Sequence, residues 1–164
     1  MAIIRQTLAD TKLTPDRLEL EITETVLIND TTFVDPILNE LRDMGIRIAL
    51  DDFGSGYCGL HYLHQFTIDK IKVDKTIIDE ACSSEKALNI LRGVSKIASE
   101  IGMTITVEGV DSHEKAALLD QEKCADEVQG FFYSRPVPAD LVPPMLERAS
   151  RNKHGRAVLV FERP

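Results

Sequence analysis

The stretch at residues 48–63, IALDDFGSGYCGLHYL, decides the fold class of this chain. A short apolar run ends in two adjacent aspartates, Asp51 and Asp52, and a glycine-rich turn follows at once. Short apolar runs bounded by turn residues are typical of buried strands, so we expect a strand over residues 46–50. Two like charges at the end of a buried strand indicate a binding edge, because adjacent carboxylates repel unless a cation neutralises them.

Strands and helices alternate on both sides of this stretch. Period-two or apolar runs predict further strands at 18–22, 68–73, 103–107 and 126–129. Helical periodicity predicts helices at 2–12, from Thr31 or Thr32 to Gly45, from Ser83 or Ser84 to Gly102, at 112–121 and at 139–148. Each return to a parallel strand needs a crossover helix. The alternation therefore predicts an α/β fold with about five parallel strands and flanking helices.

The composition is that of an ordinary globular domain, with 43% hydrophobic and 28% charged residues among 164. No apolar stretch approaches the roughly 18–20 residues of a membrane span, and we find no secretory signal. Three scattered cysteines indicate a reducing compartment, so we expect a cytoplasmic protein. The net charge of −8 argues against a nucleic-acid polymer as partner. An anionic substrate would need a divalent cation beside it.

Polar side chains stand at or near the carboxyl end of every predicted strand. They are Glu21, Asp51 and Asp52, Lys72 and Asp74, Glu108, and Gln129. In a parallel sheet or barrel these ends share one face, which is where α/β barrels hold their chemistry. Carboxylate oxygens are the ligands that Mg²⁺ and Mn²⁺ prefer. A pair of such ions, about 3.5–4 Å apart, can hold both oxygens of a phosphoryl displacement.

Each of these residues also has an ordinary structural explanation. Asp-Asp before glycine is common loop chemistry, and a single acid or lysine usually lies at the surface. Only their occurrence on successive strands favours a functional site. His61 and His64 lie one helical turn apart, but no third nitrogen or sulfur ligand is near them in sequence, so we assign them no metal.

Five motifs make the chain recognisable. They are LELEITE (18–24), DDFGSGY (51–57), IDKIKVD (68–74), VEGV (107–110) and QGFFYSRPVP (129–138). In this order they resemble the EAL family of bacterial cyclic di-GMP phosphodiesterases, from residue 1 to about residue 147. The resemblance implies a modified TIM-type barrel. It also implies hydrolysis of cyclic di-GMP to linear pGpG with two Mg²⁺ or Mn²⁺ ions.

The resemblance also implies roles for individual residues. By motif matching, the metal ligands would be Glu21, Asp51, Asp52 and Glu108, with Glu108 alternatively acting near the water as a base. Lys72 would orient the hydrolytic water, with Asp74 and Gln129 in support. Glu24 would brace the loop of Phe53, Gly54 and Gly56, which in the family lies at the dimer interface.

The departures from the family are as informative as the matches. The chain contains no Glu-Ala-Leu segment and no Asn-x-Ser strand, and both normally supply metal ligands. A complete barrel takes roughly 250 residues. We therefore expect an incomplete TIM-type barrel over 1–147, with 148–164 as a basic tail or linker.

Three functions remain open at this point. The first is a cyclic di-GMP phosphodiesterase domain that is inactive as this isolated fragment. The second is a non-catalytic truncated EAL module that acts by protein association, because unpaired strand edges promote self-association. In a longer protein, sensory or diguanylate cyclase-type domains are the expected N-terminal neighbours. A receiver-like phosphoacceptor domain fits poorly, because its lysine normally precedes a proline and lies further from the acidic pair.

Overall fold

The structure is a computed structural model that describes residues 1–29, 31–55 and 61–151. They divide between two compact units, one formed by residues 1–74 with 98–104 and one by residues 75–97 with the chain from 105 onward. The five strands form one sheet in the order in which they follow along the chain. The first strand pairs with the second, the second with the third and the fourth with the fifth, and these pairings are all parallel. The predicted α/β class with five strands and flanking helices is confirmed.

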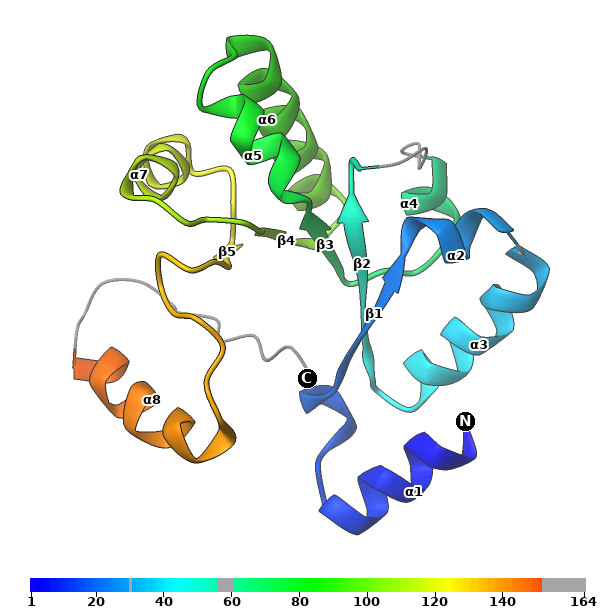
Figure 1. The fold of residues 1–164 in the computed structure, drawn as a ribbon. Coiled ribbons are helices and arrows are strands. Elements are labelled where there is room, and N and C mark those ends of the chain that lie inside the picture. Colours follow the sequence, from blue (N-terminus) through cyan, green and yellow to red (C-terminus); the bar gives the residue numbers. More distant parts are fainter. Residues whose placement is uncertain (30, 56–60, 152–164) are drawn as a thin grey trace. The chain divides into compact units, whose positions relative to one another are not determined.

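The first unit carries the first three strands (Figure 1). Its elements are α1 (Ala2–Thr11), η1 (Pro15–Arg17), β1 (Glu19–Thr23), α2 (Glu24–Asn29), α3 (Thr31–Asp43), β2 (Arg47–Phe53), α4 (His61–Gln65) and β3 (Lys70–Val73). The helices α2 and α3 form the crossover that lets β2 run parallel to β1. Because Gly45 has a φ of 84°, it allows the chain to leave α3 and enter β2 within a few residues.

The core of this unit lies between α3 and one face of β2. Ile48 and Leu50 are fully buried, and Leu38 and Leu41 of α3 are almost so. Burying one such side chain contributes about 1.5–3 kcal/mol. Successive residues of a strand point to opposite faces, so Asp51 lies on the face away from Ile48 and Leu50. The apolar face of β2 therefore builds the core and leaves the other face for charged groups.

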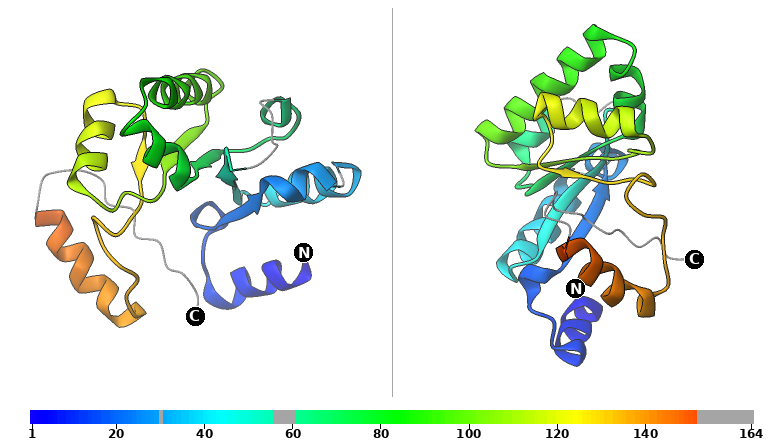
Figure 2. Two further views of the ribbon diagram at one scale, coloured as in Figure 1. Left: turned by 45° about the horizontal axis from the view of Figure 1, so that its top comes forward. Right: turned by 90° about the vertical axis from the view of Figure 1, so that its left-hand side faces the viewer.

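The second unit continues with α5 (Lys75–Ala81), α6 (Glu85–Glu100), β4 (Thr104–Val107), α7 (His113–Glu122), β5 (Glu127–Val128), η2 (Ala139–Leu141) and α8 (Val142–Arg151). Figure 2 shows α5 and α6 side by side, as Figure 1 also does. The α7 helix begins after Ser112, whose Oγ accepts a hydrogen bond from Lys115 N at 3.3 Å. Val107 and Val110 before α7 and Leu119 within it are buried.

In each unit an aspartate just before a strand makes the same pair of hydrogen bonds to the preceding strand. Asp69, just before β3, donates its backbone N–H to Ile48 O at 2.9 Å and accepts from Ile48 N through Oδ2 at 2.8 Å. Asp126, just before β5, binds Ile105 in the same way, at 3.0 Å and 2.9 Å. In each case the two partners are 21 residues apart. Each aspartate thus sets the register of a new strand against the previous one.

The predicted elements differ from the observed ones at several boundaries. The short helices α2, α4 and α5 were not predicted, and α8 continues to Arg151 rather than ending at residue 148. The strand predicted to end at Leu50 extends to Phe53, so Asp51 and Asp52 lie within β2 and not after it. Ser84 is the cap of α6, since its Oγ accepts from Ala87 N at 3.3 Å. In the described part of the chain, no helix combines the length and the apolar character that a membrane crossing requires.

Candidate functional site

Three neighbouring strands bring charged side chains together around Lys72. The lysine lies on β3 and is only 5% exposed. Its Nζ is 2.7 Å from Glu21 Oε1 of β1 and 2.8 Å from Asp51 Oδ1 of β2. Asp51 Oδ1 is itself buried, so its ion pair with Lys72 is shielded from solvent. One ammonium therefore faces two carboxylates, which leaves a net negative charge among the three groups.

The strand register explains why these residues meet. Glu21 pairs with Ala49, and Ala49 pairs with Lys70, so the small alanine lies between two charged strands. One layer along the same face, Lys70 Nζ donates to Glu19 Oε1 at 2.9 Å. This Glu19–Lys70 pair was not predicted. The period-two spacing of acids in residues 19–21 and of lysines in residues 70–72 was the signal that could have found it.

Asp52 occupies an irregular position in β2. The pairing of β2 with β3 shifts register between Leu50 and Phe53, and Asp52 has a left-handed φ of 58°. Partial burial raises the pKa of Asp52, and the neighbouring charges of Asp51 and Asp74 raise it further. Lys72 acts in the opposite direction but less strongly. The site therefore holds more negative charge than its lysine neutralises.

The loop after β2 is braced from α2. Glu24 is only 4% exposed, and its Oε1 accepts a hydrogen bond from Gly54 N at 3.0 Å. Gly54 has a φ of 94°, which favours glycine, and Phe53 is buried. Gly56 lies outside the described residues. The predicted connection of this loop with dimerisation stays a prediction.

Glu108 and Gln129 belong to the second unit, where each directly follows a strand. Gln129 N donates to Val107 O at 2.9 Å, and Gln129 O accepts from Val110 N at 3.0 Å. Gln129 Oε1 is buried, and none of the residues that the structure describes donates a hydrogen bond to it. The backbone of Gln129 thus fixes the ends of the two neighbouring strands. In the first unit, Asp74 N donates to Phe53 O at 3.2 Å, which places Asp74 beside the Asp52 loop.

The acidic groups in this region are carboxylates, which are the ligands that a hard divalent cation prefers. Their spacing does not form a closed ligand set. Among the residues that the structure describes, no three His, Cys, Asp or Glu side chains lie close enough to hold a metal ion. The assignment of Glu21, Asp51, Asp52 and Glu108 as ligands therefore stays a prediction.

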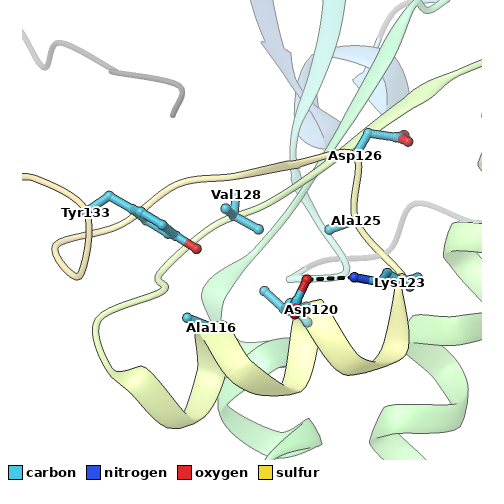
Figure 3. A pocket seen from close by; sticks show the side chains of 8 residues that line it. Ala116, Asp120, Lys123, Ala125, Asp126, Val128 and Tyr133 are labelled. Atoms are coloured by element: carbon cyan, nitrogen blue, oxygen red, sulfur yellow. Dashed lines mark hydrogen bonds and ion pairs between the residues drawn. The ribbon is translucent and has the colours of Figure 1, made fainter. Parts of the chain in front are cut away.

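A separate pocket lies in the second unit (Figure 3). Its volume is about 260 Å³, and it lies between α7, β5 and Tyr133. Asp120 and Lys123 form an ion pair of 2.6 Å at its wall, and burial raises the pKa of Tyr133. None of the residues predicted as functional lines this pocket, so we assign it no part in the site.

Comparison with known proteins places these features in a family. The sequence model of the EAL domain family matches residues 1–136 of this chain. The cyclic di-GMP phosphodiesterase NbdA of Pseudomonas aeruginosa is 33% identical over 82% of this chain and 17% of its own length. The EAL domain of DcpA from Mycobacterium smegmatis has a TM-score of 0.81 and 30% identity, over 88% of this chain and 65% of that one. A manganese and cyclic di-GMP complex of BlrP1 from Klebsiella pneumoniae has a TM-score of 0.77 and 34% identity, over 82% and 34%.

The matches extend over most of this chain but over a smaller share of each relative. The chain spans between 16% and 20% of the length of the curated relatives it matches. The aligned region includes Glu21, Asp51, Asp52, Lys72, Glu108 and Gln129. The five motifs, the parallel sheet and the family match together show that this chain belongs to the EAL domain family.

Proposed function

We propose that this chain forms part of a phosphodiesterase site that hydrolyses cyclic di-GMP to pGpG. One observation carries the proposal: Lys72 Nζ contacts the carboxylates of both Glu21 and Asp51. These three residues come from three adjacent strands of an EAL-family sheet. The names of the relatives support it, since NbdA is a cyclic di-GMP phosphodiesterase and BlrP1 was solved with manganese and cyclic di-GMP.

The proposed roles follow the chemistry of each side chain. Two Mg²⁺ or Mn²⁺ ions, when bound, supply Lewis acidity for phosphoryl transfer. Glu21, Asp51, Asp52 and Glu108 hold these ions. Lys72 orients the attacking water or a substrate phosphate, and Asp74 and Gln129 support the site. Glu24 keeps the loop of Phe53 and Gly54 in place through the contact with Gly54 N.

The metal part of the proposal can be tested with a matched pair of variants. Glu21 and Glu40 have side chains that are 43% and 44% exposed, and each forms an ion pair, with Lys72 and with Arg5 respectively. Glu21→Gln and Glu40→Gln therefore remove the same charge at equal exposure. We expect Glu21→Gln to weaken Mn²⁺ binding by about tenfold or more, equivalent to about 1.4 kcal/mol, and Glu40→Gln to leave it unchanged. Isothermal titration with MnCl₂ measures this, and equal affinities in the two variants would contradict the proposal.

Hydrolysis by the 164 residues alone is a separate question. Their sequence contains neither a Glu-Ala-Leu segment nor an Asn-x-Ser strand. We therefore propose that this chain by itself forms little or no pGpG. The assay incubates the purified chain with cyclic di-GMP and MnCl₂ and separates the products by chromatography. Rapid formation of pGpG would contradict the proposed inactivity and would support the phosphodiesterase assignment directly.

A non-catalytic function by association is the second candidate. The strand order begins at β1 and ends at β5, so both are edge strands that can pair with another chain. We propose that the chain self-associates, or joins sensory or cyclase-type domains of a longer protein, in the cytoplasm. Cys82 and Cys124 are free thiols, which is compatible with a reducing compartment. Sedimentation as a single monomeric species would contradict self-association.

A further inference from the structure

Lys115 makes an unusually complete set of contacts beside the end of β4. Its side chain is 13% exposed and extends from α7. Nζ lies 2.6 Å from Asp79 Oδ1 of α5 and 2.7 Å from Asp111 Oδ1, and it donates to Gly109 O at 3.1 Å. A lysine ammonium has three protons to donate, and here three acceptors surround it. Two of these acceptors belong to the segment that directly follows Glu108.

This segment, residues 109–111, is tightly confined. Gly109 has a φ of 69°, and a Cβ at this position would overlap Cβ of Lys75. Val110 is fully buried, and its N–H donates to Gln129 O at 3.0 Å. A Cβ on Gly130 would overlap the backbone of Val110. Backbone packing therefore fixes Val110, and Lys115 fixes the residues on either side of it.

The charges explain why Lys115 is needed. Asp79 and Asp111 both lie within 2.7 Å of Nζ, so the two carboxylates face a common point. Without the ammonium they would repel each other, and the carbonyl of Gly109 would add a third partial negative charge. Because Asp79 belongs to α5, this repulsion would push residues 109–111 away from that helix. Glu108, bonded directly to Gly109, would move with them.

We propose that Lys115 is a positioning residue, which joins α5 to the segment after β4 and thereby sets the place of Glu108. Lys115 touches neither metal nor substrate in this role. The inference rests on the proposed function in that Glu108 is taken to be a metal-binding residue. The joining of α5 to residues 109–111 does not depend on that assignment, so the two parts can be tested separately.

Lys123 provides a matched control in the same part of the chain. It caps α7 and pairs with Asp120 at 2.6 Å, but its side chain is 75% exposed. Lys115→Gln and Lys123→Gln make the same change in charge, the first at the ion pairs with Asp79 and Asp111 and the second at the surface. Lys115→Arg keeps the charge, and Asp111→Asn removes one anchor with little change in size. Circular dichroism establishes that each variant retains its helices, and Asp111→Asn serves as the test if Lys115→Gln does not fold.

The first measurement is amide hydrogen exchange of the peptide that covers residues 108–112, without metal. We expect Lys115→Gln, and to a lesser degree Asp111→Asn, to raise its exchange rate by about tenfold, as for other losses of local protection. Lys123→Gln should exchange like the wild type, and Lys115→Arg should lie between. Equal exchange in Lys115→Gln and Lys123→Gln would overturn the proposal.

The second measurement is Mn²⁺ affinity of the same proteins. Residues that orient metal ligands typically change affinity by about tenfold to a hundredfold when removed. We expect a loss in this range for Lys115→Gln, none for Lys123→Gln, and partial recovery in Lys115→Arg. Wild-type affinity in Lys115→Gln would overturn the positioning role and leave the proposed function intact. A wild type that binds no Mn²⁺ would instead contradict the proposed function and the role toward Glu108. Amide hydrogen exchange would then test only whether Lys115 joins α5 to residues 109–111.

Discussion

Lys72 and Glu21 meet at 2.7 Å between Nζ and Oε1, although their strands are separated by β2. Adjacent strands lie about 4.8 Å apart, so the two backbones are separated by roughly 10 Å. Only long side chains such as lysine and glutamate can meet across that distance. Ala49 lies between them on β2 and is small enough to leave the path open. The contact therefore depends on three strands at once.

Removal of Lys72 should destabilise the fold. In Lys72→Met, Glu21 and Asp51 lose a buried positive partner and face each other with like charge. Breaking a fully buried pair costs about 3–5 kcal/mol, and we expect a smaller loss here because Glu21 is partly exposed. Urea unfolding measures the change. Lys96→Met, at an exposed position of α6, is the control and should lie within about 0.5 kcal/mol of the wild type.

The Asp52→Asn variant should be more stable than the wild type at neutral pH. The folded pKa of Asp52 is raised, first by burial and then by Asp51 and Asp74, so the folded state binds this proton more tightly than the unfolded state does. The ionised carboxyl therefore destabilises the fold above its folded pKa, and this cost disappears below the ordinary value of 3.8. Asparagine also tolerates the left-handed backbone.

The measurement is the midpoint of urea unfolding of the wild type and of Asp52→Asn as a function of pH. The advantage of Asp52→Asn should be full at pH 7 and should vanish as both states become protonated in acid. A constant difference at every pH would show that charge is not its cause.

Three glycines should respond differently to the same substitution. Gly109→Ala and Gly130→Ala place a Cβ into Lys75 and into the backbone of Val110, respectively. For Gly109, the left-handed backbone alone costs about 1–2 kcal/mol. Gly93, inside α6, has no atom within 4 Å of an added Cβ, so Gly93→Ala should stabilise by about 0.5–1 kcal/mol. Thermal unfolding of the three variants checks this, and equal melting temperatures would refute the close approach.

The sequence predicted the order of the elements because their physical signals are local. The apolar stripe of α6 and the cap at Ser84 are visible within a few turns of one another. The helices α2 and α5 were missed because six and seven residues are too few to show a helical period. The extension of β2 to Phe53 was missed because Asp52 continues the strand through a left-handed residue.

The site was predictable in its residue types and less so in its contacts. Acids and a lysine at strand ends indicated a charged face, and Glu21, Asp51 and Lys72 do meet there. The Glu19–Lys70 pair depends on register, which pairing of strands fixes and local sequence does not. For Lys115, only the spacing of four residues from Asp111 was visible in the sequence, because its other carboxylate partner, Asp79, lies 36 residues away.

The paired bonds of Asp69 with Ile48 and of Asp126 with Ile105 have a consequence for how such domains can vary. Each aspartate fastens a strand to its predecessor, so the β2–β3 step and the β4–β5 step each carry their own alignment device, and Asp69 O also accepts a hydrogen bond from Thr104 N at 2.9 Å. The step that ends at Asp126 can then be exchanged for the corresponding step of a homologous domain, whereas an exchange at Asp69 must also preserve the bond to Thr104. The fold is interchangeable by segments, and chimeras joined just before these aspartates should keep their strands in register.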